Sequence, residues 1–426
     1  MSVDTIFALS SGRPPAAVSI IRVSGPLAHD AGSRLAGSLP EPRYASVRTL
    51  HGGDGSRLDD ALVLRFDGPA SSTGENVVEF QCHGGRAVVD VVLQELGAIE
   101  GLREALPGEF TRRAFENGRI DLTEAEGLAD LIEAETESQR RAALAVAEGG
   151  VRRQVELWQD RVLELAARAE AAIDYAGDDE TSVDPNLSRE CGALAFELQD
   201  WLDRPRVEPL KDGVRVVIAG PPNAGKSSLI NALSGRERAI VTDIPGTTRD
   251  HIEVPLALEG VPILLIDTAG LRETAEVVEQ IGVERARSLV EAADILLWLG
   301  EGIDEPVHPR LVWVHPRSDL PGREVAPDGS LPVSSVSGEG LKALLAHIAQ
   351  IAHSLLPAED AISLNRRQAG ELAYAHEDLE AAAQTEDLVL VAEGLRSARA
   401  AFDRLTGRAG VEDLLDALFG RFCLGK

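Results

Sequence analysis

Cysteine is scarce in this chain of 426 residues, and Cys82, Cys191 and Cys423 lie far apart. Their number and spacing exclude a framework of disulfide bonds and a Cys-x-x-Cys metal site. No run of about 18 continuous apolar residues occurs, and the N-terminus lacks the pattern of a signal peptide. These absences predict a cytoplasmic chain that does not cross a membrane.

Positive charge and aromatic side chains are also in short supply. The chain has 42 basic against 70 acidic residues, a formal charge of −28, and only 4% of its residues are aromatic. Such a chain is not expected to coat nucleic acid by net charge or by stacking on bases. Any contact with nucleic acid therefore needs a local basic patch or a partner protein.

Lysine is the rarest basic residue, with only Lys211, Lys226, Lys342 and Lys426 beside 38 arginines. Genomic base composition explains most of this bias. The lysine ammonium is nevertheless a compact point charge, whereas the arginine guanidinium is a planar group with several N–H donors. Each remaining lysine is therefore a candidate for a position where arginine would not serve.

The chain is too long for one ordinary hydrophobic core, and the pattern of predicted secondary structure changes three times along it. An α+β segment is followed by a helical segment in which Thr123 and Glu126 predict a capping box. Strands and helices then alternate as in a parallel α/β sheet, and the chain ends helical. The two helical segments flank a complete α/β unit, which indicates an inserted domain. The predicted boundaries are 1–118, 119–212, 213–353 and 354–426.

A phosphate-binding loop is the most specific local signal. Residues 220–227 read GPPNAGKS, between the apolar run VRVVIAG and the helical stretch SLINALSG. Glycines allow backbone N–H groups to turn toward phosphate oxygens at a helix N-terminus. Lys226 is expected to reach the β- and γ-phosphates, and the Ser227 hydroxyl to bind Mg²⁺.

Two further motifs indicate which nucleotide binds. Asp267 to Gly270 read DTAG after a second apolar strand, and residues 246–250 read GTTRD. In GTPases such segments contact the metal and the γ-phosphate, and Thr248 is placed to coordinate Mg²⁺. Leu271 follows DTAG, and an aliphatic side chain cannot orient the attacking water. Another residue must do so, and Glu273, Glu276 and Glu279 lie just downstream.

The longer sequence blocks resemble the bacterial tRNA modification GTPases of the MnmE (TrmE) family. They are GPPNAGKSSLINAL, IVTDIPGTTRD, DTAGLRE, the terminal FCLGK, and in the N-terminal part SIIRVSGP, TGENVVEFQCHGG and PGEFTRRAFENGRIDLTEAE. The resemblance is colinear over nearly the whole chain. It implies an N-terminal α+β folate-binding domain that also dimerises, a discontinuous helical-bundle domain, and an inserted Ras-like P-loop GTPase domain.

The resemblance also implies a function. The family, together with a flavin-containing partner, modifies the C5 position of the wobble uridine in certain tRNAs. The one-carbon unit comes from 5-formyltetrahydrofolate or a related reduced folate, and K⁺ stimulates GTP hydrolysis. A homodimer, a heterotetramer with the partner, and tRNA held mainly by the partner are expected.

Site residues are implied by the matching motifs. The resemblance makes Glu279 the catalytic residue and assigns K⁺ to Asn223, Thr242, Ile244 and Thr247. Its folate residues are Arg22, Glu79, Arg119 and Lys426, with arginine at 119 where the family commonly has lysine. The predicted GTP-binding set is Asn223, Ala224, Gly225, Lys226, Ser227, Ser228, Thr242, Asp243, Ile244, Pro245, Gly246, Thr247, Thr248, Asp267, Thr268, Ala269, Gly270 and Asp319.

One motif departs from the usual pattern. GTPases generally read guanine with Asn-Lys-x-Asp, but residues 316–319 read PRSD. Asp319 can still accept hydrogen bonds from guanine, and Arg317 can cover the ring, whereas Pro316 lacks even a backbone N–H. The motif leaves discrimination between GTP and ATP open. A ribosome-assembly GTPase, a purely regulatory GTPase switch, and a folate-dependent one-carbon transferase that its G domain merely regulates are the alternatives to tRNA modification.

Overall fold

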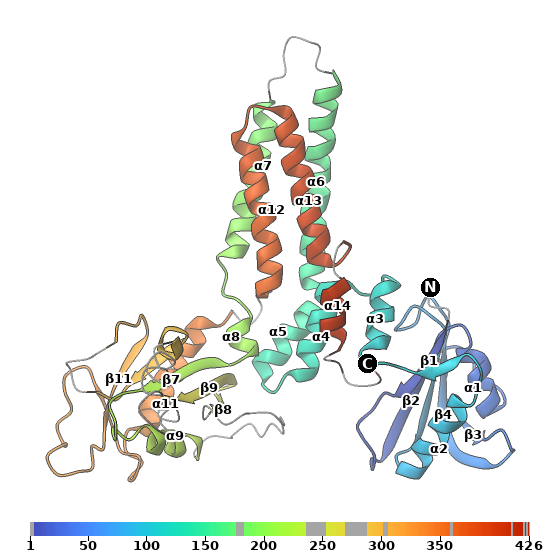
Figure 1. Ribbon diagram of the computed structural model, residues 1–426, viewed down its shortest axis with the longest axis horizontal. Helices are drawn as coiled ribbons and strands as arrows, with labels where there is room; N and C mark the ends of the chain where they lie inside the picture. Colours follow the sequence, from blue (N-terminus) through green and yellow to red (C-terminus); the bar gives the residue numbers. More distant parts are fainter. Residues whose placement is uncertain are drawn as a thin grey trace, which may run out of the picture. The chain divides into compact units, whose positions relative to one another are not determined.

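The structure is a computed structural model that describes residues 4–175, 183–235, 253–268, 288–300, 306–357, 361–409, 412–420, 422 and 425. The chain divides into two compact units. The first comprises Met1–Ala129, Val146–Thr181 and Asp387–Lys426, and the second Asp130–Ala145 and Ser182–Glu386. Both units combine distant parts of the sequence (Figure 1). Among the helices in the described ranges, none has the length and apolar composition needed to cross a membrane.

The N-terminal part of the first unit is built on a largely antiparallel sheet. Its described strands lie in the order β3-β4-β5-β2-β1-β6, with β1 and β6 parallel. Their bounds are Thr5–Leu9 (β1), Val18–Ser24 (β2), Ser46–His51 (β3), Arg57–Phe66 (β4), Val77–His83 (β5) and Leu102–Glu104 (β6).

Two helices, α1 (Ala28–Ala36) and α2 (Arg86–Gly97), share a core with this sheet. The sequence is ambiguous between strand and helix for residues 87–96, and the structure makes them helical. The reason is their periodicity, because Val89, Val92 and Leu96 are buried at helical spacing.

The chain terminus packs against the segment that comes after this sheet. Helix α14 (Glu412–Phe419) contacts α3 (Glu109–Glu116), where the Arg112 guanidinium donates to the Asp416 carboxylate at 2.8 Å. Gly108 has φ +69°, and a Cβ at this position would lie 2.3 Å from the Phe419 carbonyl oxygen. The GEFTRRAF motif therefore begins with a glycine that the C-terminal helix requires.

The cap of α4 (Leu122–Glu133) differs from the predicted one. Asp121, not Thr123, caps the helix: its Oδ1 accepts from the Glu124 N–H at 2.9 Å, and Glu124 Oε2 accepts from the Asp121 N–H at 2.8 Å. The capping box lies two residues earlier than predicted because the helix already begins at Leu122. Thr123 instead donates its hydroxyl hydrogen to Asp121 Oδ1 at 2.7 Å.

Long helices from the two helical segments pack in pairs. In the first unit α6 (Gly150–Tyr175) packs on α13 (Leu388–Thr406), with the rings of Trp158 and Phe402 stacked 6.0 Å apart. In the second unit α7 (Pro185–Leu202) packs on α12 (Arg366–Gln384). Each pair joins a helix from residues 119–212 to a helix from residues 354–426. The first pair belongs to the first unit and the second pair to the second unit.

The α/β part of the second unit is a mostly parallel sheet in the order β12-β11-β10-β7-β9-β8. The five predicted strands all form: Val214–Ala219 (β7), Val261–Asp267 (β9), Ile295–Trp298 (β10), Leu311–Pro316 (β11) and Leu331–Val333 (β12). The sequence missed β8 (Glu253–Leu258), which pairs antiparallel with β9 at the sheet edge. Its Pro255 weakens the strand signal but is tolerated at an edge.

Three shorter helices also belong wholly or largely to the second unit: α5 (Glu137–Ala147), α8 (Glu208–Lys211) and α9 (Lys226–Ser234). A fourth, α11 (Leu341–Leu355), buries Leu344 and Ile348 in the same core as β7 and β9. Strand β7 lies between β9 and β10, so the loop that leaves its C-terminal end opens at the middle of the sheet. This is the usual position of a ligand site in parallel α/β sheets.

Candidate nucleotide site

The loop between β7 and α9 has the backbone that its sequence predicts. Gly220, Asn223 and Gly225 have φ values of +151°, +61° and +98°. A Cβ at position 220 would lie 3.1 Å from the Leu299 side chain, so both backbone angle and space favour glycine there. Gly225 precedes α9, and no side chain of the described residues caps the helix. The first N–H groups of α9 are thus available for an anion.

Lys226 lies inside this loop, and only 8% of its surface is exposed. Its Nζ donates to the carbonyl oxygens of Gly220 and Pro221, each at 2.9 Å. The loop wraps around the ammonium group, which holds a compact positive charge at the base of the predicted phosphate site. This agrees with lysine, and not arginine, at this position.

A hydroxyl and a carboxylate meet beside the same loop. The Ser227 hydroxyl donates to Asp267 Oδ2 at 2.8 Å, and Asp267 ends β9 with 1% exposure. Next to it, the Thr268 hydroxyl donates to the Ile218 carbonyl at 2.9 Å, which ties β9 to β7. Hard oxygen ligands such as these suit Mg²⁺, which usually combines few protein oxygens with phosphates and waters. Ser227 and Asp267 therefore fit the predicted metal.

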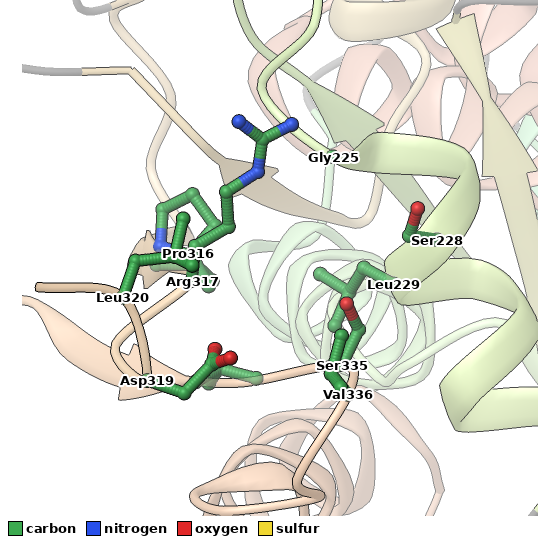
Figure 2. A pocket seen from close by; sticks show the side chains of 11 residues that line it. Gly225, Ser228, Leu229, Pro316, Arg317, Asp319, Leu320, Ser335 and Val336 are labelled. Atoms are coloured by element: carbon green, nitrogen blue, oxygen red, sulfur yellow. The ribbon is translucent and has the colours of Figure 1, made fainter.

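A cavity of about 190 Å³ lies next to Gly225. It is lined by Gly225, Ser228, Leu229, Val314, Pro316, Arg317, Asp319, Leu320, Val333, Ser335 and Val336. Figure 2 shows the Arg317 guanidinium extending toward Gly225, with the Asp319 carboxylate on the same turn. The cavity lining thus combines apolar side chains with one carboxylate and one guanidinium, a chemistry that suits a planar base with N–H donors.

Arg317 connects this cavity to the phosphate loop. Its Nη2 donates to the Asn223 carbonyl at 2.6 Å, and its own φ is +60°. Both ends of this hydrogen bond are non-glycine residues in the left-handed region, which is uncommon. The sequence predicted that Arg317 could cover the base, but not that it would bond to the phosphate loop.

The remaining predicted nucleotide residues lie outside the described residues. They are Thr242, Asp243, Ile244, Pro245, Gly246, Thr247, Thr248, Ala269, Gly270 and the predicted catalytic Glu279. The structure does bring together Asn223, Ala224, Gly225, Lys226, Ser227, Ser228, Asp267, Thr268 and Asp319, all of which lie on or beside β7, β9, α9 and the turn after β11.

Two of the predicted folate residues contact each other in the first unit. Arg22 on β2 is registered opposite Glu79 on β5, and its Nε donates to Glu79 Oε1 at 2.8 Å. The neighbours Ile21, Val23, Val78 and Phe80 are buried in the core shared with α1 and α2. Since side chains alternate along a strand, Arg22 and Glu79 lie on the opposite face. There the Arg22 guanidinium lies 5.5 Å from the centre of the Phe110 ring.

The structure says less about the other two predicted folate residues, Arg119 and Lys426. Arg119 is exposed, and its Cγ would lie 3.3 Å from a Cβ placed on Gly74. Lys426 lies outside the described residues, but the neighbouring Gly425 has φ +90° and abuts the end of β1. A Cβ at position 425 would lie 2.0 Å from the Leu9 carbonyl oxygen.

Sequence reasoning missed one charged residue nearby. Arg113 on α3 is only 3% exposed and forms ion pairs with Asp4, Glu75 and Glu109 at 2.9–3.1 Å. It links the start of β1, the turn before β5, and α3. Its place in GEFTRRAF was visible, but its burial depends on contacts with residues up to 109 positions away.

Family models and full-length relatives agree with these features. A model described as the MnmE helical domain matches residues 122–423, and one described as the GTP-binding protein TrmE N-terminus matches residues 5–119. A tRNA modification GTPase MnmE of Rhizorhabdus wittichii is 54% identical, covering 99% of this chain and 97% of its own length. The protein of the same name from Erythrobacter litoralis is 51% identical over 100% of both chains.

Among solved structures, the G domain of the T. maritima FeoB iron transporter is 26% identical and covers 33% of this chain and 98% of its own, with a TM-score of 0.24. Identity near one half over the full length of both relatives, together with the two family models, decides the assignment. The chain belongs to the MnmE family of tRNA modification GTPases.

Proposed function

We propose that this chain is a K⁺-stimulated GTP hydrolase that acts with a flavin-dependent partner on the C5 position of wobble uridine in certain tRNAs. The GTP hydrolase function is supported mainly by the loop at the end of β7. Lys226, the Ser227–Asp267 pair and a base-sized cavity lie together there. The tRNA role is supported by the full-length relatives named as tRNA modification GTPases.

In this proposal the phosphates of GTP bind the loop 220–227. The N–H groups at the start of α9 and the Lys226 ammonium offset their negative charge. Ser227 and Thr248 would hold Mg²⁺, which would neutralise charge on the phosphate oxygens. The Asp319 carboxylate accepts hydrogen bonds from guanine, and the Arg317 stem covers the ring. Ala224, Ser228, Asp243, Pro245, Gly246, Thr268, Ala269 and Gly270 complete the nucleotide contacts.

The K⁺ site is proposed at Asn223, Thr242, Ile244 and Thr247. The Asn223 carbonyl accepts from Arg317, and in this proposal the Asn223 side-chain oxygen is the group offered to the cation. A cation there offsets charge that develops on the phosphates, as an arginine finger does in other GTPases.

We expect GTP turnover in KCl to exceed that in NaCl by about tenfold or more, since one lost electrostatic contact to the developing charge has at least this effect. ATP turnover should stay at background in both salts if Asp319 reads the base. The measurement is steady-state phosphate release at matched ionic strength. Equal rates in the two salts would refute the K⁺ site, and equal GTP and ATP turnover would refute guanine selection.

The same proposal divides the chain into a folate-binding and dimerising domain (1–118), a helical domain (119–212 with 354–426) and a G domain (213–353). The protein forms a homodimer, assembles with the flavin-containing partner into a heterotetramer, and acts in the cytoplasm. With a charge of −28, it leaves most tRNA contacts to that partner. A reduced folate such as 5-formyltetrahydrofolate binds Arg22, Glu79, Arg119 and Lys426.

We expect Glu79→Gln to weaken 5-formyltetrahydrofolate binding about tenfold or more, because an amide replaces a carboxylate that accepts charge-assisted hydrogen bonds. Calorimetry on the full chain measures the affinity. The matched control is Glu100→Gln, which changes an exposed carboxylate in the same domain. A Glu79→Gln protein that binds the folate as the wild type does would contradict the folate assignment.

A further inference from the structure

The turn that carries Arg317 and Asp319 starts from an unusual residue. It leaves β11 at Pro316, which has neither a backbone N–H nor a polar side chain to hold the turn in place. Two successive backbone hydrogen bonds shape the turn itself. The Leu320 N–H donates to the Arg317 carbonyl at 3.1 Å, and the Arg323 N–H donates to the Leu320 carbonyl at 3.0 Å.

Arg323 connects the end of this turn to the end of β11. Its Nε donates to the Pro316 carbonyl at 3.0 Å. The buried His315 donates from Nε2 to the Arg323 carbonyl at 3.0 Å, which leaves Nδ1 as an acceptor 3.5 Å from Arg323 Nη2. Arg323 is therefore bonded, through its side chain and its backbone, to the last two residues of β11. The hydrogen bonds of Arg323 therefore hold the two ends of the turn 317–322 next to each other.

The turn held in this way carries two side chains that line the base cavity, while Arg323 itself does not line it. Asp319 supplies the cavity's carboxylate, and Arg317 bonds to the Asn223 carbonyl in the phosphate loop. Displacement of Pro316 or of the turn would move the Asp319 carboxylate, whereas the Lys226 ammonium is held by the Gly220 and Pro221 carbonyls, outside the turn. A hydrogen bond to the Asp319 carboxylate tolerates only a few tenths of an ångström before it weakens.

We propose that Arg323 is a positioning residue for base recognition. It fixes the Pro316 carbonyl, and through it the turn that presents Asp319 to the base, in place of the side-chain anchor that position 316 lacks. This inference rests on the proposed GTP-binding function. It predicts that loss of Arg323 harms the contacts to the guanine edge and spares the contacts to the phosphates.

The test compares GDP with inosine diphosphate, which lacks the guanine 2-amino group and so one of the two donors available to Asp319. For Arg323→Ala we expect GDP affinity to fall about tenfold, the effect of a lost charge-assisted hydrogen bond, with a smaller loss for inosine diphosphate. The preference for GDP over inosine diphosphate should therefore shrink. KM for GTP should rise while kcat at saturation stays within about twofold.

Two further variants keep the test decisive. Arg323→Lys retains one donor within reach of the Pro316 carbonyl and should recover part of the GDP preference. Arg310→Ala, an exposed arginine just before β11, should change neither affinity. Thermal unfolding of all three proteins shows whether any loss of binding is a loss of fold.

Several outcomes would overturn the inference: an unchanged GDP preference in Arg323→Ala, equal losses for both nucleotides, or a fall in kcat alone. Unfolding of both Arg323 variants at the assay temperature would also count against it, because the residue would then serve the fold and not the base. Failure of the proposed function looks different, since the wild-type protein itself would then bind ADP as well as GDP.

Discussion

Replacing Lys226 by arginine should weaken GTP binding almost as much as replacing it by alanine, although arginine keeps the charge. The Lys226 ammonium lies 2.9 Å from the carbonyl oxygens of both Gly220 and Pro221, in a loop that leaves only 8% of the residue exposed. A planar guanidinium does not fit among these groups without moving the loop. Hydrogen bonds to charged phosphates contribute strongly, so we expect GTP affinity to fall about 100-fold or more in both variants.

Fluorescent GTP analogues or calorimetry provide the measurement, and the lysine-poor sequence supplies a matched control. Lys342→Ala removes an exposed lysine from α11 of the same unit and should leave binding unchanged. GTP binding by Lys226→Arg within a few-fold of the wild type would show that charge alone, and not the shape of the side chain, is required at this position.

For Glu279→Ala we expect GTP turnover to fall by about 100-fold or more, the usual size of a lost proton-transfer or water-orienting group. Nucleotide affinity should change little, since this carboxylate is proposed to act on the attacking water and not on GTP. Glu279 is assigned this role because Leu271 stands where many GTPases have a water-orienting glutamine, and an aliphatic side chain cannot orient water. Single-turnover hydrolysis together with nucleotide affinity separates chemistry from binding.

Glu276→Ala is the control, because it removes a carboxylate three residues away in the same segment and should leave turnover intact. In cells, a strain that carries Glu279→Ala should lack the C5 modification of wobble uridines, as a strain without the gene should. Mass spectrometry of tRNA nucleosides detects both. Near-normal single-turnover hydrolysis would refute the role of Glu279, and unchanged wobble uridines in the deletion strain would refute the tRNA function.

The phosphate site was predictable because its determinants are local. Gly220, Gly225 and Lys226 lie within seven residues, between a buried strand and a helix, and the backbone angles that they adopt follow from the residue types. The five strands of the α/β segment were predictable for a related reason, because a continuous apolar run bounded by turns has few alternatives in such a sheet. β8 was missed because an edge strand with a proline lacks such a run.

Full-length resemblance added residues that no local pattern indicates. Arg22 and Glu79 are 57 positions apart, and each alone resembles an ordinary surface charge. Their contact at 2.8 Å follows from the register of β2 against β5. The opposite charges and the sheet register are consistent with one ligand, but only the paired strands bring the two side chains together.

The sequence by itself determined the phosphate loop, the order of motifs along the chain and the scarcity of lysine that marks Lys226. Those features depend on residue type and on neighbours within one turn or strand. Tertiary structure alone decided how the base turn is held: Arg317 bonds to Asn223 across 94 positions, and Arg323 bonds back to Pro316. The Arg317–Asn223 contact depends on where the sheet places the end of β11 relative to the phosphate loop, and the Arg323–Pro316 contact depends on how the chain folds back after β11. The spacing of residues in the chain specifies neither geometry.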